Sequence, residues 1–139
     1  MEDKKTKVLI VEDEEILLTA LSEELKQEGF DVVGAKDGIE GVEKAISEKP
    51  DLILLDLVMP RLDGIGALKQ IKENPDIKDI PVVILTNLSD YDKVSDALSL
   101  GAMDYLVKAN YRLEELVNKI KVVVERRRSG MLAPPPMAP

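Results

Sequence analysis

The feature of this 139-residue chain that most constrains its fold is a fivefold alternation of short apolar runs with segments of helical periodicity. The apolar runs cover residues 7–11, 31–35, 52–55, 81–85 and 104–107. After each run, aliphatic residues recur at the three- and four-residue spacing of a half-buried helix, over residues 14–28, 38–48, 65–73, 90–100 and 113–124. This alternation predicts βαβ units and a parallel sheet with helices on both faces.

Five such units are too few for an eightfold barrel, so we predict an α/β fold with an open, doubly wound parallel sheet. The first, third and fourth runs are almost entirely apolar, as central strands covered on both faces should be. The second run is weaker and suits a position nearer the edge. Folds of this class bind ligands beyond the carboxyl ends of their strands, so the residues that follow each run are the candidates for a site.

The pattern divides the chain into one folded domain over residues 1–128 and a terminal segment over residues 129–139. Three consecutive prolines, 134–136, prevent the last helix from continuing. We predict a linker or disordered tail here, with a polyproline-type docking peptide as the alternative. No output domain follows residue 128 in this sequence, which suits either a protein that acts alone or a piece of a longer one.

Composition argues against several classes of function. The net charge of −8 and the 3% aromatic content disfavour direct contact with nucleic acid or a membrane surface. No apolar run approaches the ~18 residues of a membrane span, and residues 1–7 lack the apolar core of a signal peptide, so we expect a cytoplasmic protein. The absence of cysteine and histidine excludes thiolate chemistry, histidine-bound zinc and Ser–His–Asp catalysis.

Polar side chains that can carry chemistry follow four of the five apolar runs. They are Glu12, Asp13, Asp56, Thr86 and Lys108. Because parallel strands end at the same edge of a sheet, we expect these side chains to surround one crevice. Three clustered carboxylates repel one another, and a hard divalent cation, Mg²⁺ or its substitute Mn²⁺, would neutralise them. A cation and a lysine beside a carboxylate form a site for a phosphoryl group, which Asp56 would accept as an acyl phosphate.

Each of these residues also has an ordinary structural explanation. An aspartate after a strand is commonly a turn residue, and acidic residues before a helix favour its dipole. A threonine suits a strand end, and a lysine there is usually solvated. The joint occurrence of all five, in this order at four strand ends, favours the phosphoryl site over five separate explanations.

Four stretches of the chain resemble the two-component response-regulator receiver domain, and the resemblance spans residues 7 to about 127. VLIVEDE resembles the first strand and acidic pair of the family, and DLILLDLVMPRLDG resembles its phosphoacceptor strand and loop. PVVILT resembles the fourth strand with its switch hydroxyl, and GAMDYLVK the fifth strand with its lysine. The resemblance implies a five-stranded, flavodoxin-like sheet in the order 2-1-3-4-5, with two helices on one face and three on the other.

The resemblance also implies the roles of the acidic residues. Asp56 would be the phosphoacceptor, with a histidine kinase or phosphotransfer protein as the donor. Asp13, Asp56 and the backbone carbonyl of Val58 would bind Mg²⁺ directly. Glu12 would bind the cation mainly through a water molecule.

Three further residues would stabilise the phosphoryl group and transmit its arrival. Lys108 would pair with the group, Thr86 would donate a hydrogen bond to it, and Tyr105 matches the rotating aromatic residue of the family. Phosphorylation would change the surface of the fourth helix, fifth strand and fifth helix, where an output partner or a second copy of the chain would bind.

The chain departs from the family pattern at two positions. Ala109 stands where proline is usual, so we predict either a trans Lys108–Ala109 bond with a shifted loop or a strained cis bond. Asn87 occupies a position where a smaller residue is usual. Together with Val58 and Leu88 it would tune the access of water to the acyl phosphate, and slow self-hydrolysis is our hypothesis.

Two other functions remain open. An aspartyl phosphatase or phosphotransferase often carries a second aspartate two residues after its nucleophile, where this chain has Val58. A receiver-like module that binds partners without phosphorylation usually lacks one of the key residues, whereas all five are present here. We therefore expect a regulatory phosphoacceptor and not an enzyme.

Overall fold

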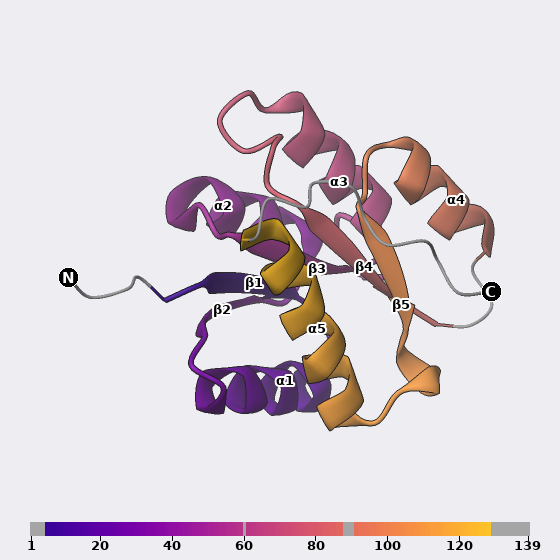
Figure 1. Cartoon of the computed structure of the whole chain (residues 1–139). Helices are drawn as coiled ribbons and strands as arrows, with labels where there is room; N and C mark the ends of the chain where they lie inside the picture. The colour runs from indigo at the N-terminus through magenta and orange to yellow at the C-terminus, as the bar shows by residue number, and fades with distance from the viewer. Residues whose placement is uncertain (1–4, 60, 88–90, 129–139) are drawn as a thin grey trace.

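Strands and helices alternate along the whole domain (Figure 1) in the computed structural model, which describes residues 5–59, 61–87 and 91–128. The strands are β1 (Lys7–Val11), β2 (Asp31–Ala35), β3 (Leu52–Asp56), β4 (Val82–Thr86) and β5 (Asp104–Val107). The helices are α1 (Glu15–Gln27), α2 (Gly38–Glu48), α3 (Gly64–Glu73), α4 (Tyr91–Ser99) and α5 (Leu113–Arg128), with a 3₁₀ turn at Lys108–Asn110. Each predicted strand and helix is confirmed, with small differences at the ends.

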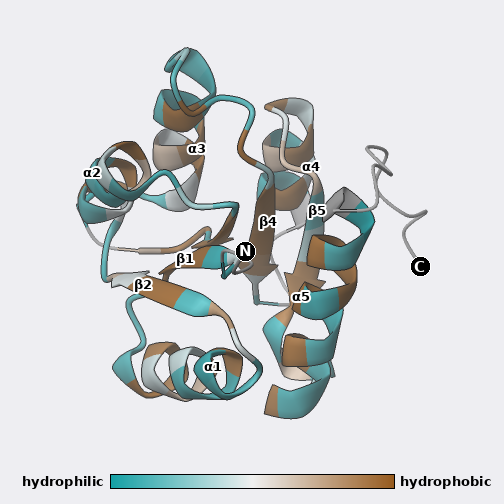
Figure 2. Ribbon diagram, turned by 60° about the vertical axis from the view of Figure 1, so that its left-hand side comes forward, coloured by the Kyte–Doolittle hydropathy of each residue, from teal (hydrophilic) through white to brown (hydrophobic). Residues whose placement is uncertain are grey.

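The five strands form one parallel sheet in the order β2-β1-β3-β4-β5. After β2 the chain crosses to the other side of β1, so the strand order reverses between β1 and β3, which is the place where folds of this class bind ligands. Helices α1 and α5 cover one face of the sheet, and α2, α3 and α4 cover the other (Figures 1 and 2). The predicted doubly wound, flavodoxin-like sheet is therefore confirmed.

Two aliphatic clusters, one on each face of the sheet, form the core. In β1, Leu9 and Val11 belong to the cluster beneath α2, α3 and α4, whereas Val8 and Ile10 belong to the cluster beneath α1 and α5. This division follows from the two-residue period of a strand. Strands β3 and β4 are buried along their whole length, but β2 is fully buried only at Ala35, as its weaker apolar pattern predicted for an edge strand.

Two aspartates fix where helices begin on the face of the sheet that α2, α3 and α4 cover. Asp37 and Asp63 are the N-caps of α2 and α3, and their carboxylates accept hydrogen bonds from the N–H groups of Glu40 (2.9 Å) and Gly66 (2.8 Å). Residue 90, the first of the fourth predicted helix, lies outside the described residues, as does the proline-rich segment 129–139. The division of the chain at residue 128 stays a prediction.

Across the described ranges, no helix combines the length and apolar character needed to cross a membrane.

Candidate functional site

The carboxyl ends of four neighbouring strands carry the residues that the sequence singled out. Glu12 and Asp13 follow β1, Asp56 and Thr86 are the last residues of β3 and β4, and Lys108 follows β5. Asp56 and Thr86 were expected just beyond their strands but lie within them, because both still pair with the neighbouring strand. Glu12, Asp56 and Thr86 are buried, whereas Asp13 is exposed.

The three carboxylates form one cluster. One oxygen from each of Glu12, Asp13 and Asp56 lies within 4.8 Å of the others. The backbone of Glu12 donates to the Ala35 carbonyl (2.9 Å), and its Oε2 accepts from the N–H of Glu14 (3.0 Å), so the side chain is held in place. Its other oxygen, Oε1, is buried and forms an ion pair with the Lys108 ammonium. Three carboxylates this close together offer the oxygen ligands that a hard divalent cation prefers, so these residues fit Mg²⁺.

Lys108 supplies the compensating positive charge. Its Nζ lies 2.7 Å from Glu12 Oε1, 3.3 Å from Asp56 Oδ2 and 3.5 Å from Glu14 Oε1. No peptide bond in the described ranges is cis, so the trans alternative at Ala109 is confirmed. The 3₁₀ turn that begins at Lys108 still brings its ammonium group to the carboxylates. Glu14 was not predicted to join the site, and its only sequence signal is its position two residues after Glu12.

The surroundings of Asp56 shift its pKa strongly. Burial raises its pKa, the nearby Glu12 carboxylate raises it further, and Lys108 and the N–H of Val58 lower it; the result is a pKa of about 7 against an ordinary value of 3.8. Burial alone would lower the pKa of Lys108, but its contacts with Glu12 and Asp56 outweigh burial and raise it. Near neutral pH, Asp56 therefore alternates between acid and carboxylate beside a lysine that stays charged.

The loop between β3 and α3 closes over Asp56. The N–H of Val58 donates to Asp56 Oδ1 (3.3 Å), and the N–H of Gly64 donates to the Leu57 carbonyl (2.9 Å). A Cβ atom on Gly64 would lie 2.3 Å from the Asp56 carbonyl oxygen, so only glycine allows α3 to begin this close to the end of β3. Val58 is 48% exposed, and its predicted role in controlling access to the acidic cluster stays a prediction.

The residues expected to respond to a phosphoryl group surround the same edge. The Thr86 hydroxyl donates to the carbonyl oxygen of the exposed residue Asn87 (3.1 Å), so it is engaged within its own loop and not with Asp56. Tyr105 is half-buried and packs against the core beneath α2, α3 and α4. Leu88 lies outside the described residues. The roles of these residues in switching and in controlling water access stay predictions.

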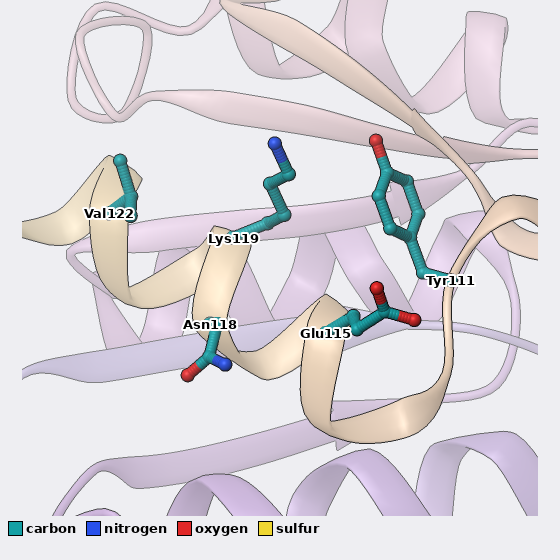
Figure 3. Close-up of a pocket in the computed structure, with 5 residues that line it drawn as sticks. All are labelled: Tyr111, Glu115, Asn118, Lys119 and Val122. Atoms are coloured by element: carbon teal, nitrogen blue, oxygen red, sulfur yellow. The ribbon is translucent and has the colours of Figure 1, made fainter.

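A groove of about 290 Å³ on α5 lies apart from the acidic cluster. Tyr111, Lys119 and Val122 point to the same side of the helix in Figure 3, and the full lining is Tyr111, Glu115, Asn118, Lys119 and Val122. The Lys119 ammonium lies 5.8 Å from the centre of the Tyr111 ring. Burial raises the pKa of Asp104, at the start of β5, and the positive charge of Lys119 partly offsets this rise. All the lining residues belong to α5 or to the segment that leads into it.

Comparison with known proteins agrees with this arrangement. Residues 8–121 match the family described as the response regulator receiver domain. The response regulator ArlR of Staphylococcus saprophyticus is 44% identical over 123 residues, which are 88% of this chain and 54% of that protein. The alkaline phosphatase synthesis transcriptional regulatory protein PhoP of Bacillus subtilis is 41% identical over 129 residues, which are 92% of this chain and 51% of that protein.

A solved structure of a response regulator also has a similar fold. The phosphorylated cyanobacterial phytochrome response regulator RcpA matches with a TM-score of 0.75 and 31% identity, over 88% of this chain and 94% of that one. The chain spans about half the length of the curated relatives it matches. The family match, the relatives and the shared fold together show that this chain belongs to the response regulator receiver domain family of two-component systems.

Proposed function

We propose that this chain is a phosphoacceptor switch and that Asp56 is the residue that accepts the phosphoryl group. One observation carries the proposal: the buried Asp56 carboxylate has the Lys108 ammonium 3.3 Å from one oxygen, and oxygens of Glu12 and Asp13 lie within 4.8 Å of it. A nucleophilic carboxylate flanked by a fixed cation and by a divalent-cation site is the arrangement that phosphoryl transfer requires. The donor would be a histidine kinase or a phosphotransfer protein.

The transfer forms one bond and breaks one. An oxygen of Asp56 attacks phosphorus and forms an O–P bond, while the P–N bond to the donor histidine breaks and its electron pair returns to the imidazole. Lys108 holds one oxygen of the transferred group. The Thr86 hydroxyl turns away from the Asn87 carbonyl and donates to another oxygen.

Mg²⁺, or Mn²⁺ in its place, would be held by the carboxylates of Asp13 and Asp56 and the backbone carbonyl of Val58, with Glu12 contributing through water. Such a cation supplies charge neutralisation of the phosphoryl oxygens. The pKa of Asp56 supports this dependence, because a carboxyl group with a pKa of about 7 is only partly ionised at neutral pH. A cation bound beside it favours the ionised form that attacks phosphorus.

Phosphorylation would shift the α4-β5-α5 surface between two states. A phosphorylated side chain carries about −1.5 to −2 charge, which would draw Thr86 inward and let Tyr105 turn into the space behind it. The groove lined by Tyr111 and Lys119 lies on this surface, and it would lie within the contact to a homodimer partner or an output protein. The whole protein would act in the cytoplasm.

Three residues that come shortly after Asp56 and Thr86 in the sequence would set how long the phosphoryl group persists. They are Val58, Asn87 and Leu88, and they would limit the access of an attacking water molecule. We propose slow self-hydrolysis on this ground. A phosphoryl half-life of seconds at neutral pH, measured by loss of the added mass, would contradict it.

The function is tested by treating the purified chain with a small-molecule phosphodonor, such as a phosphoramidate, with Mg²⁺ or with EDTA. We expect intact mass to increase by one phosphoryl group with Mg²⁺, and not in EDTA or in Asp56→Asn. Asp63→Asn is the matched control, since it removes an exposed carboxylate from the same loop and keeps an N-cap. No incorporation into wild type would favour the alternative of a phosphorylation-independent interaction module.

A further inference from the structure

Arg61 connects the β3–α3 loop to the first turn of α2. Its Nη1 lies 3.2 Å from Asp37 Oδ2, and the Asp37 side chain is only 10% exposed. The other oxygen of the same carboxylate, Oδ1, accepts the hydrogen bond from Glu40 that caps α2. Asp37 therefore performs two separate tasks, one with each oxygen.

The backbone at Arg61 adopts a conformation that an arginine rarely takes. Its φ is +67°, in the left-handed region where the Cβ atom of a residue other than glycine comes too close to the following carbonyl oxygen. Such a conformation persists only where surrounding contacts determine it. The ion pair with Asp37 is the contact that the Arg61 side chain makes in the described part of the chain.

A second contact fixes the next residue of the loop against the same helix. A Cβ atom on Gly38 would lie 2.0 Å from the Leu62 carbonyl oxygen, so the backbones of the loop and of α2 touch at this point. Helices α2 and α3 lie side by side on this face of the sheet (Figure 2). The loop is thus held at Val58 and Gly64 by its contacts around Asp56, and at Arg61 and Leu62 by α2.

We infer that the Arg61–Asp37 ion pair positions the β3–α3 loop and thereby sets the affinity of the acidic cluster for a divalent cation. The inference rests on the proposed function, which makes the Val58 carbonyl of this loop a ligand. A loop released from α2 would present that carbonyl less often in the binding geometry, so part of the binding free energy would be needed to order it. Arg61 and Asp37 act here as positioning residues.

Charge provides a sharp distinction between positioning and simple electrostatics. If Arg61 affected the cation only through its field, removing its positive charge would strengthen Mg²⁺ binding, and removing the negative charge of Asp37 would weaken it. Positioning predicts that both changes weaken binding. Asp37→Asn is suited to this comparison, because asparagine still accepts the capping hydrogen bond.

The experiment is calorimetric titration of the metal-free chain with Mg²⁺, using wild type, Arg61→Gln, Asp37→Asn and the double variant. We expect each single variant to weaken Mg²⁺ binding about two- to fivefold, as an ion pair of this partial exposure allows, and the double variant to match the singles. Lys36→Gln removes a positive charge at the neighbouring position without touching the loop, and it should not weaken binding. Tighter binding by Arg61→Gln, or affinities of both single variants equal to wild type, would overturn the inference.

A second readout does not depend on the cation. In the metal-free chain, amide hydrogen exchange at Val58 and Gly64, whose N–H groups are hydrogen-bonded within the loop, should be faster in Arg61→Gln and Asp37→Asn than in wild type, with α2 still protected. Unchanged exchange would contradict the positioning role. Asp13→Asn distinguishes failure of this inference from failure of the proposed function. If Asp13→Asn binds Mg²⁺ as tightly as wild type, the proposed metal site itself is wrong. If Asp13→Asn loses Mg²⁺ binding but the Arg61 and Asp37 variants bind Mg²⁺ as tightly as wild type, only this inference is overturned.

Discussion

Lys108 Nζ lies 2.7 Å from Glu12 Oε1, which is closer than its 3.3 Å separation from Asp56 Oδ2. The Lys108 ammonium is therefore primarily the counter-charge of the buried Glu12 carboxylate and secondarily that of Asp56, the proposed phosphoacceptor. When Asp56 gains a phosphoryl group, we expect the ammonium to move toward the new oxygens. A cation bound near Glu12 would then replace the lysine as its counter-charge.

Replacing Lys108 tests this shared role. In Lys108→Met, Glu12 and Asp56 remain buried without their lysine, so we expect the free energy of unfolding in EDTA to fall by about 2 kcal/mol or more. Mg²⁺ should restore much of this loss, because it binds the native state. Urea denaturation with and without Mg²⁺ measures both effects.

Lys121→Met is the matched control for that substitution. Lys121 pairs with Glu28 on the surface, where both side chains are exposed, so its removal should change stability by less than about 1 kcal/mol. Equal stability losses for the two lysine variants in EDTA would contradict the account of Lys108.

The raised pKa of Asp56 predicts how stability depends on pH. Between the ordinary pKa of 3.8 and the folded value of about 7, the native state retains a proton that the unfolded state has released. Stability in EDTA should therefore be higher at acid pH and fall as the pH rises toward and through 7, by at most about 4 kcal/mol from this group. Asp56→Asn should lack this contribution.

Denaturation of both proteins over pH 4 to about 8 measures the difference. Burial also raises the pKa of Asp104, but that residue is present in both proteins and its contribution cancels. A difference in stability between wild type and Asp56→Asn that does not change with pH would show that Asp56 has an ordinary pKa.

Gly64 carries a prediction about the geometry of the loop. In Gly64→Ala the new methyl group would meet the backbone of Asp56 and Leu57, which cannot move without distorting β3. We expect a stability loss of about 2 kcal/mol or more and weaker Mg²⁺ binding. Gly34→Ala is the control, since its methyl would only touch the Leu18 side chain at 3.4 Å. Calorimetry that finds the two variants alike would contradict the proposed tight closure.

The sequence predicted the positions of the strand-end residues well, because burial and strand order alone bring them together. Glu12, Asp56 and Lys108 stand at the ends of apolar runs whose positions could be read directly from the sequence. Parallel pairing of the strands then brings these ends to the same edge of the sheet. What could not be predicted depends on side-chain reach and backbone detail. The closer contact of Lys108 with Glu12 is an example, because two neighbouring carboxylates offered equivalent partners.

The backbone conformation of the loops also could not be predicted from the pattern of apolar and polar residues. The trans bond at Ala109 was one of two alternatives, and the choice depends on how the following turn packs. Arg61 at a φ of +67° has no sequence signal, because arginine does not favour the left-handed region. Its partner Asp37 reads only as a helix cap, and the second oxygen of that carboxylate becomes informative only when α2 and the loop are seen together.

The most direct test of the central claim is to locate the phosphoryl group on the chain. After reaction with a phosphodonor and Mg²⁺, borohydride reduces an aspartyl phosphate to homoserine, and peptide mass mapping identifies the altered position. We expect homoserine at residue 56 and at no other carboxylate, with none in reactions that lack Mg²⁺. Homoserine at Asp13 or another residue, or phosphate retained by Asp56→Asn as fully as by wild type, would contradict it.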